Sequence, residues 1–124
     1  MSNLTVSAIL PVYNCERTIG TVLDCLFAAM SADYTFEVVV VDDASNDGTA
    51  DICRRYAVNL IHLSENHGPA YCRNLGVRSS TGNVLLFLDS DIEFAPDLLG
   101  KMLDRLADDT DLAGIYTLTS PDPL

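Results

Sequence analysis

Short runs of apolar residues alternate along this chain with stretches in which apolar residues recur every three or four positions. The runs cover residues 6–13, 36–41, 59–63 and 84–88, and a fifth covers 113–118. Runs of this length that are bounded by polar or turn-forming residues predict β-strands. The stretches between them predict amphipathic helices, the clearest of which carries Ile19, Val22, Leu23, Leu26, Phe27 and Met30 on one face.

The predicted helix ends follow from capping residues. Asn14 is expected to cap the first helix, and a loop at 45–48 leads into the second. Pro69 suits the first turn of the third helix, because its missing N–H has no partner there anyway, and Gly82 is its expected C-terminal cap. Pro96 is expected to begin the last helix, whose inner face carries Leu98, Leu99, Met102, Leu103 and Leu106.

The alternation of strands and helices predicts an α/β fold with a mostly parallel sheet and helices on both of its faces. The uninterrupted apolar run at 84–88 predicts a strand that is buried on both faces. The chain has 124 residues, 48% of them hydrophobic, which is enough for one domain with a core but short for two. We therefore expect residues 1–124 to form a single domain.

The charge balance restricts the classes of partner. The chain has 18 Asp and Glu residues against 7 Lys and Arg residues, a formal net charge of −11. A protein with so few cations is not expected to bind nucleic acid or anionic lipid unaided. An anionic ligand is therefore expected to arrive together with a metal ion.

The cysteines and the apolar runs bear on the cellular location. Cys15, Cys25, Cys53 and Cys72 show neither a CxxC pair nor a regular spacing, so reduced thiols are expected. No apolar run reaches the length of a membrane span, and the N-terminus does not resemble a signal peptide. A cytoplasmic location is the default expectation, with attachment to the cytoplasmic face of a membrane through a further part of a longer protein as the alternative.

Two carboxylates follow the apolar run at 84–88 directly, Asp89 and Asp91, with Ser90 between them. In a parallel sheet they would lie at the carboxyl edge, where such folds bind ligands, and paired acidic oxygens suit a hard divalent cation. The alternative is an acidic turn without a ligand. Asp42 and Asp43, after the second strand, are likewise interpreted either as a capping turn or as acceptors for the N–H and hydroxyl groups of a nucleoside.

A second polar cluster lies at the start of the third helix and consists of Asn66, Gly68, Arg73 and Asn74. Arg73 in this cluster either contacts a phosphate or pairs with Asp42, Asp43 or Asp89, and a guanidinium can serve both roles. His62 is interpreted as a packed strand residue, and His67 in the loop is weak evidence for ligand contact. The chain contains neither GxGxxG nor GxxxxGK[ST], which argues against a dinucleotide dehydrogenase and excludes a P-loop.

Four ordered motifs together match one family. They are AILPVYN at 8–14, VVVVDDASNDGT at 38–49, Asn66-His67-Gly68 with Arg73-Asn74-Leu75-Gly76, and Leu88-Asp89-Ser90-Asp91. In these motifs the chain resembles the family 2 glycosyltransferases, whose nucleotide-binding half has the Rossmann-like GT-A fold. The resemblance covers nearly the whole chain.

The resemblance implies a donor site for a UDP-sugar or GDP-sugar. Asp89 and Asp91 match the family's DXD motif, in which the carboxylates contact the ribose and hold Mn²⁺ or Mg²⁺ against the diphosphate. Such enzymes normally invert the anomeric centre, with a carboxylate base that takes a proton from the acceptor hydroxyl. The residues implied to line the nucleotide site are Pro11, Val12, Tyr13, Asp43, Arg73 and Asp89.

In the family, the base and the acceptor surface lie beyond the fifth strand, so we expect a truncated, donor-binding half, with the acceptor unknown. A truncated sheet is expected to expose an apolar edge, which favours self-association. Two other classes stay open. One is a phosphoacceptor receiver domain in which Asp89 is phosphorylated, and the other is a nucleotide-binding module without catalysis.

Overall fold

Four parallel β-strands form the central sheet of the protein. A computed structural model describes residues 4–31, 33–109, 111 and 113–115. The strands lie side by side in the order β3-β2-β1-β4, and each pairing is parallel, which confirms the predicted sheet. The strands are β1 (Thr5–Val12), β2 (Thr35–Asp42), β3 (Asn59–His62) and β4 (Val84–Phe87).

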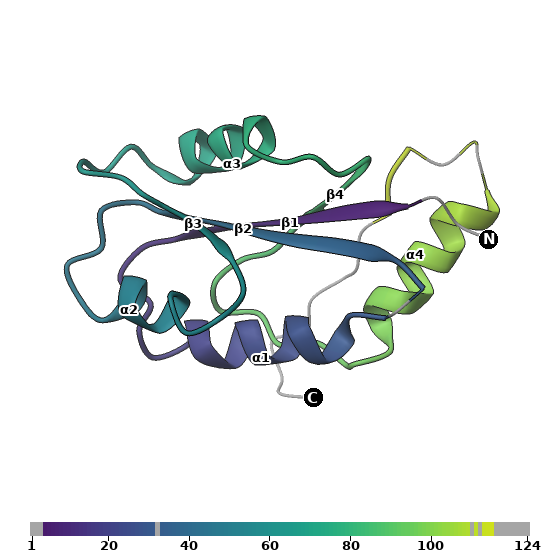
Figure 1. Ribbon diagram of the computed structural model, residues 1–124, viewed down its shortest axis with the longest axis horizontal. Helices are drawn as coiled ribbons and strands as arrows, with labels where there is room; N and C mark the ends of the chain where they lie inside the picture. Colours follow the sequence, from purple (N-terminus) through teal and green to yellow (C-terminus); the bar gives the residue numbers. More distant parts are fainter. Residues whose placement is uncertain (1–3, 32, 110, 112, 116–124) are drawn as a thin grey trace.

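Helices cover both faces of the sheet, as the alternating pattern predicts (Figure 1). On one face lie α1 (Ile19–Ala29), α2 (Thr49–Cys53) and α4 (Leu98–Asp108), and on the other lies α3 (Pro69–Arg78). The larger core joins alternate residues of β1 and β2 to α1 and α4. A smaller core beneath α3 contains Val39, Val41 and Cys72.

The prediction that the 84–88 strand is buried on both faces is wrong. Val84 and Leu86 pack against the larger core, whereas Leu85 and Phe87 are 40% and 50% exposed. β4 is the edge strand of the described sheet, and α3 packs over β1 and β2. The apolar run at 84–88 therefore belongs to a strand with only one covered face.

Two predicted helix starts are also wrong. Asn14 does not cap α1, whose N-cap is Thr18; the Asn14 side chain instead accepts the Asn46 N–H at 2.9 Å, which ties the end of β1 to the loop after β2. Pro96 lies in the turn before α4, which begins at Leu98. Of the predicted fifth strand, residues 113–115 are irregular, and the remainder lies outside the described residues.

Gly82 is not the C-terminal cap of α3, which ends at Arg78 with Ser79 as its C-cap. It lies beside the start of β1, where its N–H donates to Ser7 Oγ at 2.8 Å. A Cβ at this position would lie 2.7 Å from the Thr5 carbonyl oxygen and 2.8 Å from the Ser7 backbone nitrogen. Backbone atoms of a paired strand cannot move aside, so the close approach requires glycine.

We expect Gly82→Ala to lower the free energy of unfolding by about 1–3 kcal/mol, because the added methyl group overpacks against the backbone of β1. Urea denaturation measures the change. Gly100→Ala is the matched control: a Cβ at Gly100 meets nothing within 4 Å, and alanine inside a helix is favoured over glycine by about 0.5–1 kcal/mol. A Gly82→Ala protein as stable as the wild type would contradict this explanation.

A polar network closes the amino end of the sheet. Ser7, buried in β1, donates its hydroxyl to Glu37 Oε2 at 2.6 Å. The Thr81 N–H and hydroxyl donate to the same oxygen at 2.5 and 2.9 Å. These hydrogen bonds, that of Ser7 foremost, hold the pKa of Glu37 below its ordinary value.

This network predicts a dependence of stability on pH. A carboxyl whose pKa is depressed in the folded state stabilises the fold above its unfolded-state pKa, here about 4.3. That contribution is lost as the pH falls through the folded-state pKa. We expect the free energy of unfolding to fall with acidification, and to fall less steeply in Glu37→Gln. Denaturant titrations at stepped pH measure both slopes, and equal slopes would refute the assignment.

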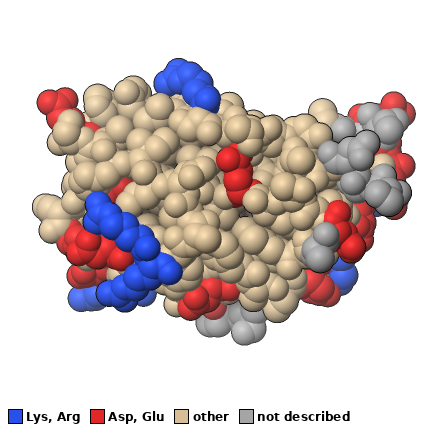
Figure 2. Space-filling model, viewed as in Figure 1, with Lys and Arg blue, Asp and Glu red and all other residues tan. Residues whose placement is uncertain are grey.

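The four cysteines Cys15, Cys25, Cys53 and Cys72 are free thiols, as predicted. No helix within the described ranges is long and apolar enough to cross a membrane. On the face shown in Figure 2, basic side chains gather at the lower left beside acidic ones, and other basic side chains lie apart from them.

Candidate functional site

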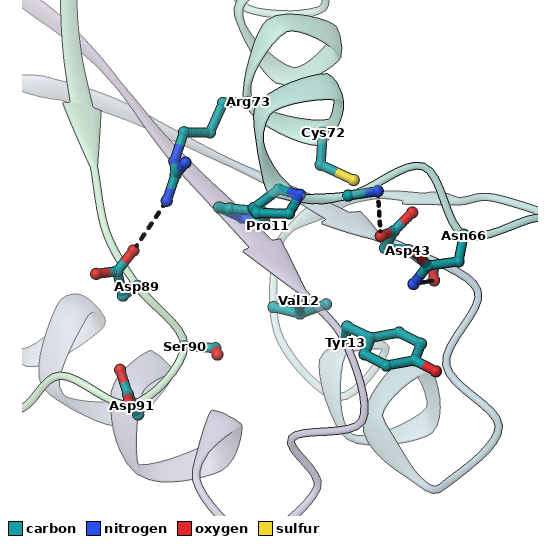
Figure 3. Close-up of a pocket in the computed structure, with 12 residues that line it drawn as sticks. Pro11, Val12, Tyr13, Asp43, Asn66, Cys72, Arg73, Asp89, Ser90 and Asp91 are labelled. Carbon is teal, nitrogen blue, oxygen red and sulfur yellow. Dashed lines mark hydrogen bonds and ion pairs between the residues drawn. The ribbon is translucent and has the colours of Figure 1, made fainter.

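The segments that follow the strands meet at the carboxyl edge of the sheet and border a cavity of about 550 Å³. This edge is where open α/β sheets bind ligands. Asn66, Gly68, Pro69, Cys72 and Ser90 form part of its lining. The cavity also brings together every predicted ligand-binding residue (Figure 3): Pro11, Val12, Tyr13, Asp43, Arg73, Asp89 and Asp91.

Asp43 forms one wall of the cavity and also holds the loop before α3. It is 3% exposed, and its Oδ1 and Oδ2 accept the N–H groups of His67 at 2.7 Å and Gly68 at 2.9 Å. Gly68 has a φ of 91°, a left-handed conformation that favours glycine. Pro69 then begins α3. Asp43 therefore fixes the direction in which the chain enters α3.

The ionisation of Asp43 reflects two opposing effects. Burial is the largest single effect and raises its pKa, but the hydrogen bonds from His67, Gly68 and Cys72, with the charge of His67, together leave the pKa below the ordinary value. The Cys72 thiol, whose own pKa burial raises to about 11, hydrogen-bonds to the same carboxylate. Because each carboxylate oxygen has two acceptor positions, Asp43 can still accept a hydrogen bond from the cavity. Asp43 can therefore both hold the turn before α3 and accept a hydrogen bond from a nucleoside, so its two interpretations are compatible.

Asp42 has a structural role. It is fully buried, and its Oδ1 accepts the Ser45 N–H at 3.1 Å and hydroxyl at 2.5 Å. Its Oδ2 lies 2.7 Å from His62 Nδ1 at the end of β3. The capping-turn interpretation therefore holds for Asp42, which is not among the residues that line the cavity.

Arg73 pairs with Asp89, which is one of the three predicted partners. Its Nη2 lies 3.3 Å from Asp89 Oδ1 across the cavity edge (Figure 3). The two side chains are 40% and 58% exposed, so water screens the pair and its contribution to stability is small. Both groups remain accessible to a ligand.

Asp89 and Asp91 flank Ser90 in the turn after β4, and both are exposed. No group of three or more His, Cys, Asp and Glu side chains placed to hold a metal ion occurs in the described part of the chain. Two carboxylates nevertheless fit a cation such as Mg²⁺, which commonly takes one or two protein carboxylates and completes its shell with water and phosphate oxygens. The donor set thus suits a cation that arrives with a phosphorylated ligand.

An aromatic ring lies at the other end of the cavity. Tyr13 is 51% exposed at the end of β1, and Figure 3 shows it beside Asn66 and Asp43. An exposed aromatic ring offers a surface on which a planar base can stack. His67 is not part of the lining; its ring stacks on Tyr71 with the centroids 4.3 Å apart.

A second cavity of about 420 Å³ shares Ser90 and Asp91 with the first. The turn after β4 therefore borders both cavities, and it is held from the side of α1. The Thr18 hydroxyl donates to the Ser90 carbonyl oxygen at 2.8 Å, and the Cys15 thiol hydrogen-bonds to Ser90. The contacts of Thr18 and Cys15 with this turn could not be predicted, because no local spacing indicates a contact between residues so far apart in the chain. The other residues that line the second cavity are Asn14, Glu16, Arg17 and Asp47.

The parallel sheet and the polar cavity at its carboxyl edge define a Rossmann-like α/β protein with its ligand site at the strand ends. The pattern described as glycosyl transferase family 2 matches residues 7–120. The chain belongs to this family, which confirms the resemblance seen in the motifs and removes the receiver-domain alternative.

Relatives of known sequence include TuaG of Bacillus subtilis, described as a putative teichuronic acid biosynthesis glycosyltransferase. It is 36% identical over 108 residues, which are 80% of this chain and 40% of TuaG. The putative glycosyltransferase EpsH of the same organism is 36% identical over 117 residues, 90% of this chain and 33% of EpsH. The chain therefore spans well under half the length of these relatives.

Solved structures show the same architecture. The mannosyltransferase PcManGT from Pyrobaculum calidifontis, in complex with GDP-Man and Mn²⁺, superposes with a TM-score of 0.80 at 34% identity over 89% of this chain and 34% of PcManGT. S. aureus TarS in complex with UDP-GlcNAc gives a TM-score of 0.76 at 31% identity over 96% of this chain and 37% of that chain. The predicted GT-A type of fold is confirmed.

Proposed function

We propose that this chain binds the donor, a nucleoside diphosphate sugar, of a glycosyltransferase that uses a divalent metal ion and inverts the anomeric centre. One observation carries the proposal: Asp43, Arg73, Asp89 and Asp91, from three separate segments, border a single cavity. The PcManGT structure contains GDP-Man and Mn²⁺, and the TarS structure contains UDP-GlcNAc, which supports this class of ligand.

The nucleoside occupies the end of the cavity near β1 and β2 in this proposal. The Tyr13 ring stacks against the base, beside the apolar surface of Pro11 and Val12. Asp43 accepts a hydrogen bond from a base N–H or a ribose hydroxyl, which is strong because the acceptor is ionised and buried.

The diphosphate occupies the end near β4. Arg73 exchanges part of its contact with Asp89 for a phosphate oxygen, since its planar guanidinium suits both anions. Asp89 and Asp91 hold Mn²⁺ or Mg²⁺, which when bound neutralises the charge that develops on the departing nucleoside diphosphate. The inverting displacement also needs an acceptor hydroxyl and a carboxylate base, and neither role is assigned to a residue of this chain.

Calorimetry with UDP and GDP, each with and without Mn²⁺, tests the proposal. We expect at least one of the two nucleotides to bind, and to bind more tightly with the metal ion, because two carboxylates and a net charge of −11 oppose an unaccompanied diphosphate. Uridine and guanosine, which have no diphosphate, are the controls and should show no such gain. Metal-independent binding of both nucleotides, or binding of neither, would count against the proposal.

The exposed side of β4 supports self-association. Phe87 is paired with Ile9, and the Ile9 carbonyl accepts the Leu88 N–H at 3.1 Å. The backbone N–H and C=O of Phe87 therefore point away from β1, toward the edge of the sheet that the described residues form. Its side chain is 50% exposed, and exposed apolar edge strands favour pairing between copies. Sedimentation of the wild type should depend on concentration, and Phe87→Thr should reduce that dependence. A wild type that sediments as a monomer at every concentration would refute it.

A further inference from the structure

The Thr18 hydroxyl links α1 to the turn that carries Asp89 and Asp91. Its Oγ1 lies 2.8 Å from the Ser90 carbonyl oxygen and donates to it across 72 positions of sequence. The Cys15 carbonyl oxygen lies 3.4 Å away, which is beyond the usual range of O–H···O hydrogen bonds. The main partner of this hydroxyl is therefore the residue between the two carboxylates.

Helix capping does not account for this side chain. Thr18 is the N-cap of α1, a position at which threonine usually accepts a hydrogen bond from the first helical turn. Here the Thr18 side chain makes no capping hydrogen bond. The contact that its hydroxyl does make lies outside the helix, at the edge of the candidate site.

The turn at 89–91 depends on few contacts for its position. The hydrogen-bond ladder between β4 and β1 reaches the Leu88 N–H, which donates to Ile9 at 3.1 Å. Beyond it, Asp89 is held by an exposed pair with Arg73, and exposed pairs restrain side chains weakly. The Cys15 thiol also hydrogen-bonds to Ser90, but a thiol is a weak donor. The Thr18 hydrogen bond, in contrast, is partly buried and acts on the backbone in the middle of the turn.

We propose that Thr18 is a positioning residue for this turn. By holding the Ser90 carbonyl oxygen, it sets the direction of the Asp89 and Asp91 carboxylates so that both can face one cation. This inference rests on the proposed function, in which these two carboxylates hold the metal ion. α1 is a rigid support for them, because its inner face is fully buried in the core.

The test compares three variants of the full chain. Thr18→Val removes the hydroxyl and keeps the shape, and Thr18→Ser keeps the hydroxyl. Thr21→Val makes the same chemical change at an exposed position of α1. Groups that only orient metal ligands affect metal affinity by about 10–100-fold. We therefore expect Thr18→Val to weaken Mn²⁺ binding in the presence of UDP or GDP by about tenfold or more, measured by electron paramagnetic resonance of free Mn²⁺.

The remaining expectations separate positioning from a general loss of structure. Thr18→Ser and Thr21→Val should bind Mn²⁺ as the wild type does, and Thr18→Val should bind UDP and GDP without metal as the wild type does. Unchanged Mn²⁺ affinity in Thr18→Val, or equal losses with and without metal, would overturn the inference. If Thr18→Val does not fold, Thr18→Ala is judged by the same criteria.

The two proposals can fail separately. A wild-type chain that binds neither nucleotide with Mn²⁺ would refute the proposed function and this inference with it. A wild-type chain that shows metal-dependent binding, together with a Thr18→Val variant that matches it, would refute only the role of Thr18.

Discussion

Asp91→Ala is expected to abolish the dependence of nucleotide binding on metal. In the wild type, the Asp91 carboxylate is exposed at the cavity. Together with the Asp89 carboxylate it supplies the paired acidic oxygens of the turn after β4. Loss of a group that only orients a metal ligand costs about 10–100-fold in metal affinity. Loss of a ligand should cost at least about 100-fold. Calorimetry with UDP or GDP in the presence of Mn²⁺ should then give the affinity that is found without metal.

Glu93→Ala is the matched control for Asp91→Ala. Glu93 lies two residues further along the same segment, is exposed, and lines neither cavity. The substitution Glu93→Ala removes the same formal charge as Asp91→Ala, so it measures any general effect of net charge on nucleotide affinity. If Asp91→Ala and Glu93→Ala weaken binding equally, the acidic pair is a surface turn and not a metal site.

Asp43→Asn is expected to impair both stability and binding. The substitution replaces one acceptor oxygen by an NH₂ group, which must face the N–H of His67 or Gly68 without a hydrogen bond. An unsatisfied buried donor costs about 1–3 kcal/mol. We expect that loss in the free energy of unfolding, together with weaker binding of UDP and GDP. Urea denaturation and calorimetry measure the two effects.

The control for this prediction is Asp51→Asn. Asp51 pairs with Arg54 on the exposed surface of α2, with the carboxyl side chain 78% exposed, and such pairs contribute about 0.2–1 kcal/mol at most. Its loss should therefore change stability little and binding not at all. Wild-type stability and binding in Asp43→Asn would show that the two hydrogen bonds do not hold the loop.

Much of the architecture could be predicted from sequence because the relevant signals are local. The strands and helices follow from apolar periodicity, and the strand ends follow from the polar residues after them. Since parallel strands end at one edge, Asp43, Arg73 and Asp91 could be expected to meet there, as they do. The motifs around them were specific enough to indicate the family.

Other features depend on contacts between distant segments and could not be predicted. The exposure of Phe87 depends on which strand lies at the edge of the sheet. Glycine is required at position 82 because the backbone of β1 lies close to it, and Ser7 in that strand is 75 positions away in the sequence. The helix that precedes Gly82 does not require glycine there. The roles of Asp42 and Asp43 are distinguished only by burial and partners, because both residues suit a turn and a binding site.

Paramagnetic broadening in nuclear magnetic resonance spectra tests most directly whether the separate segments form one metal-bridged nucleotide site. With UDP or GDP present, a small amount of Mn²⁺ is expected to broaden the amide signals of Asp89, Ser90, Asp91 and Arg73 first. The signals of Thr5, Thr35 and Asn83, at the opposite end of the sheet, should stay sharp. Broadening centred on α4, or spread evenly over the chain, would contradict the account.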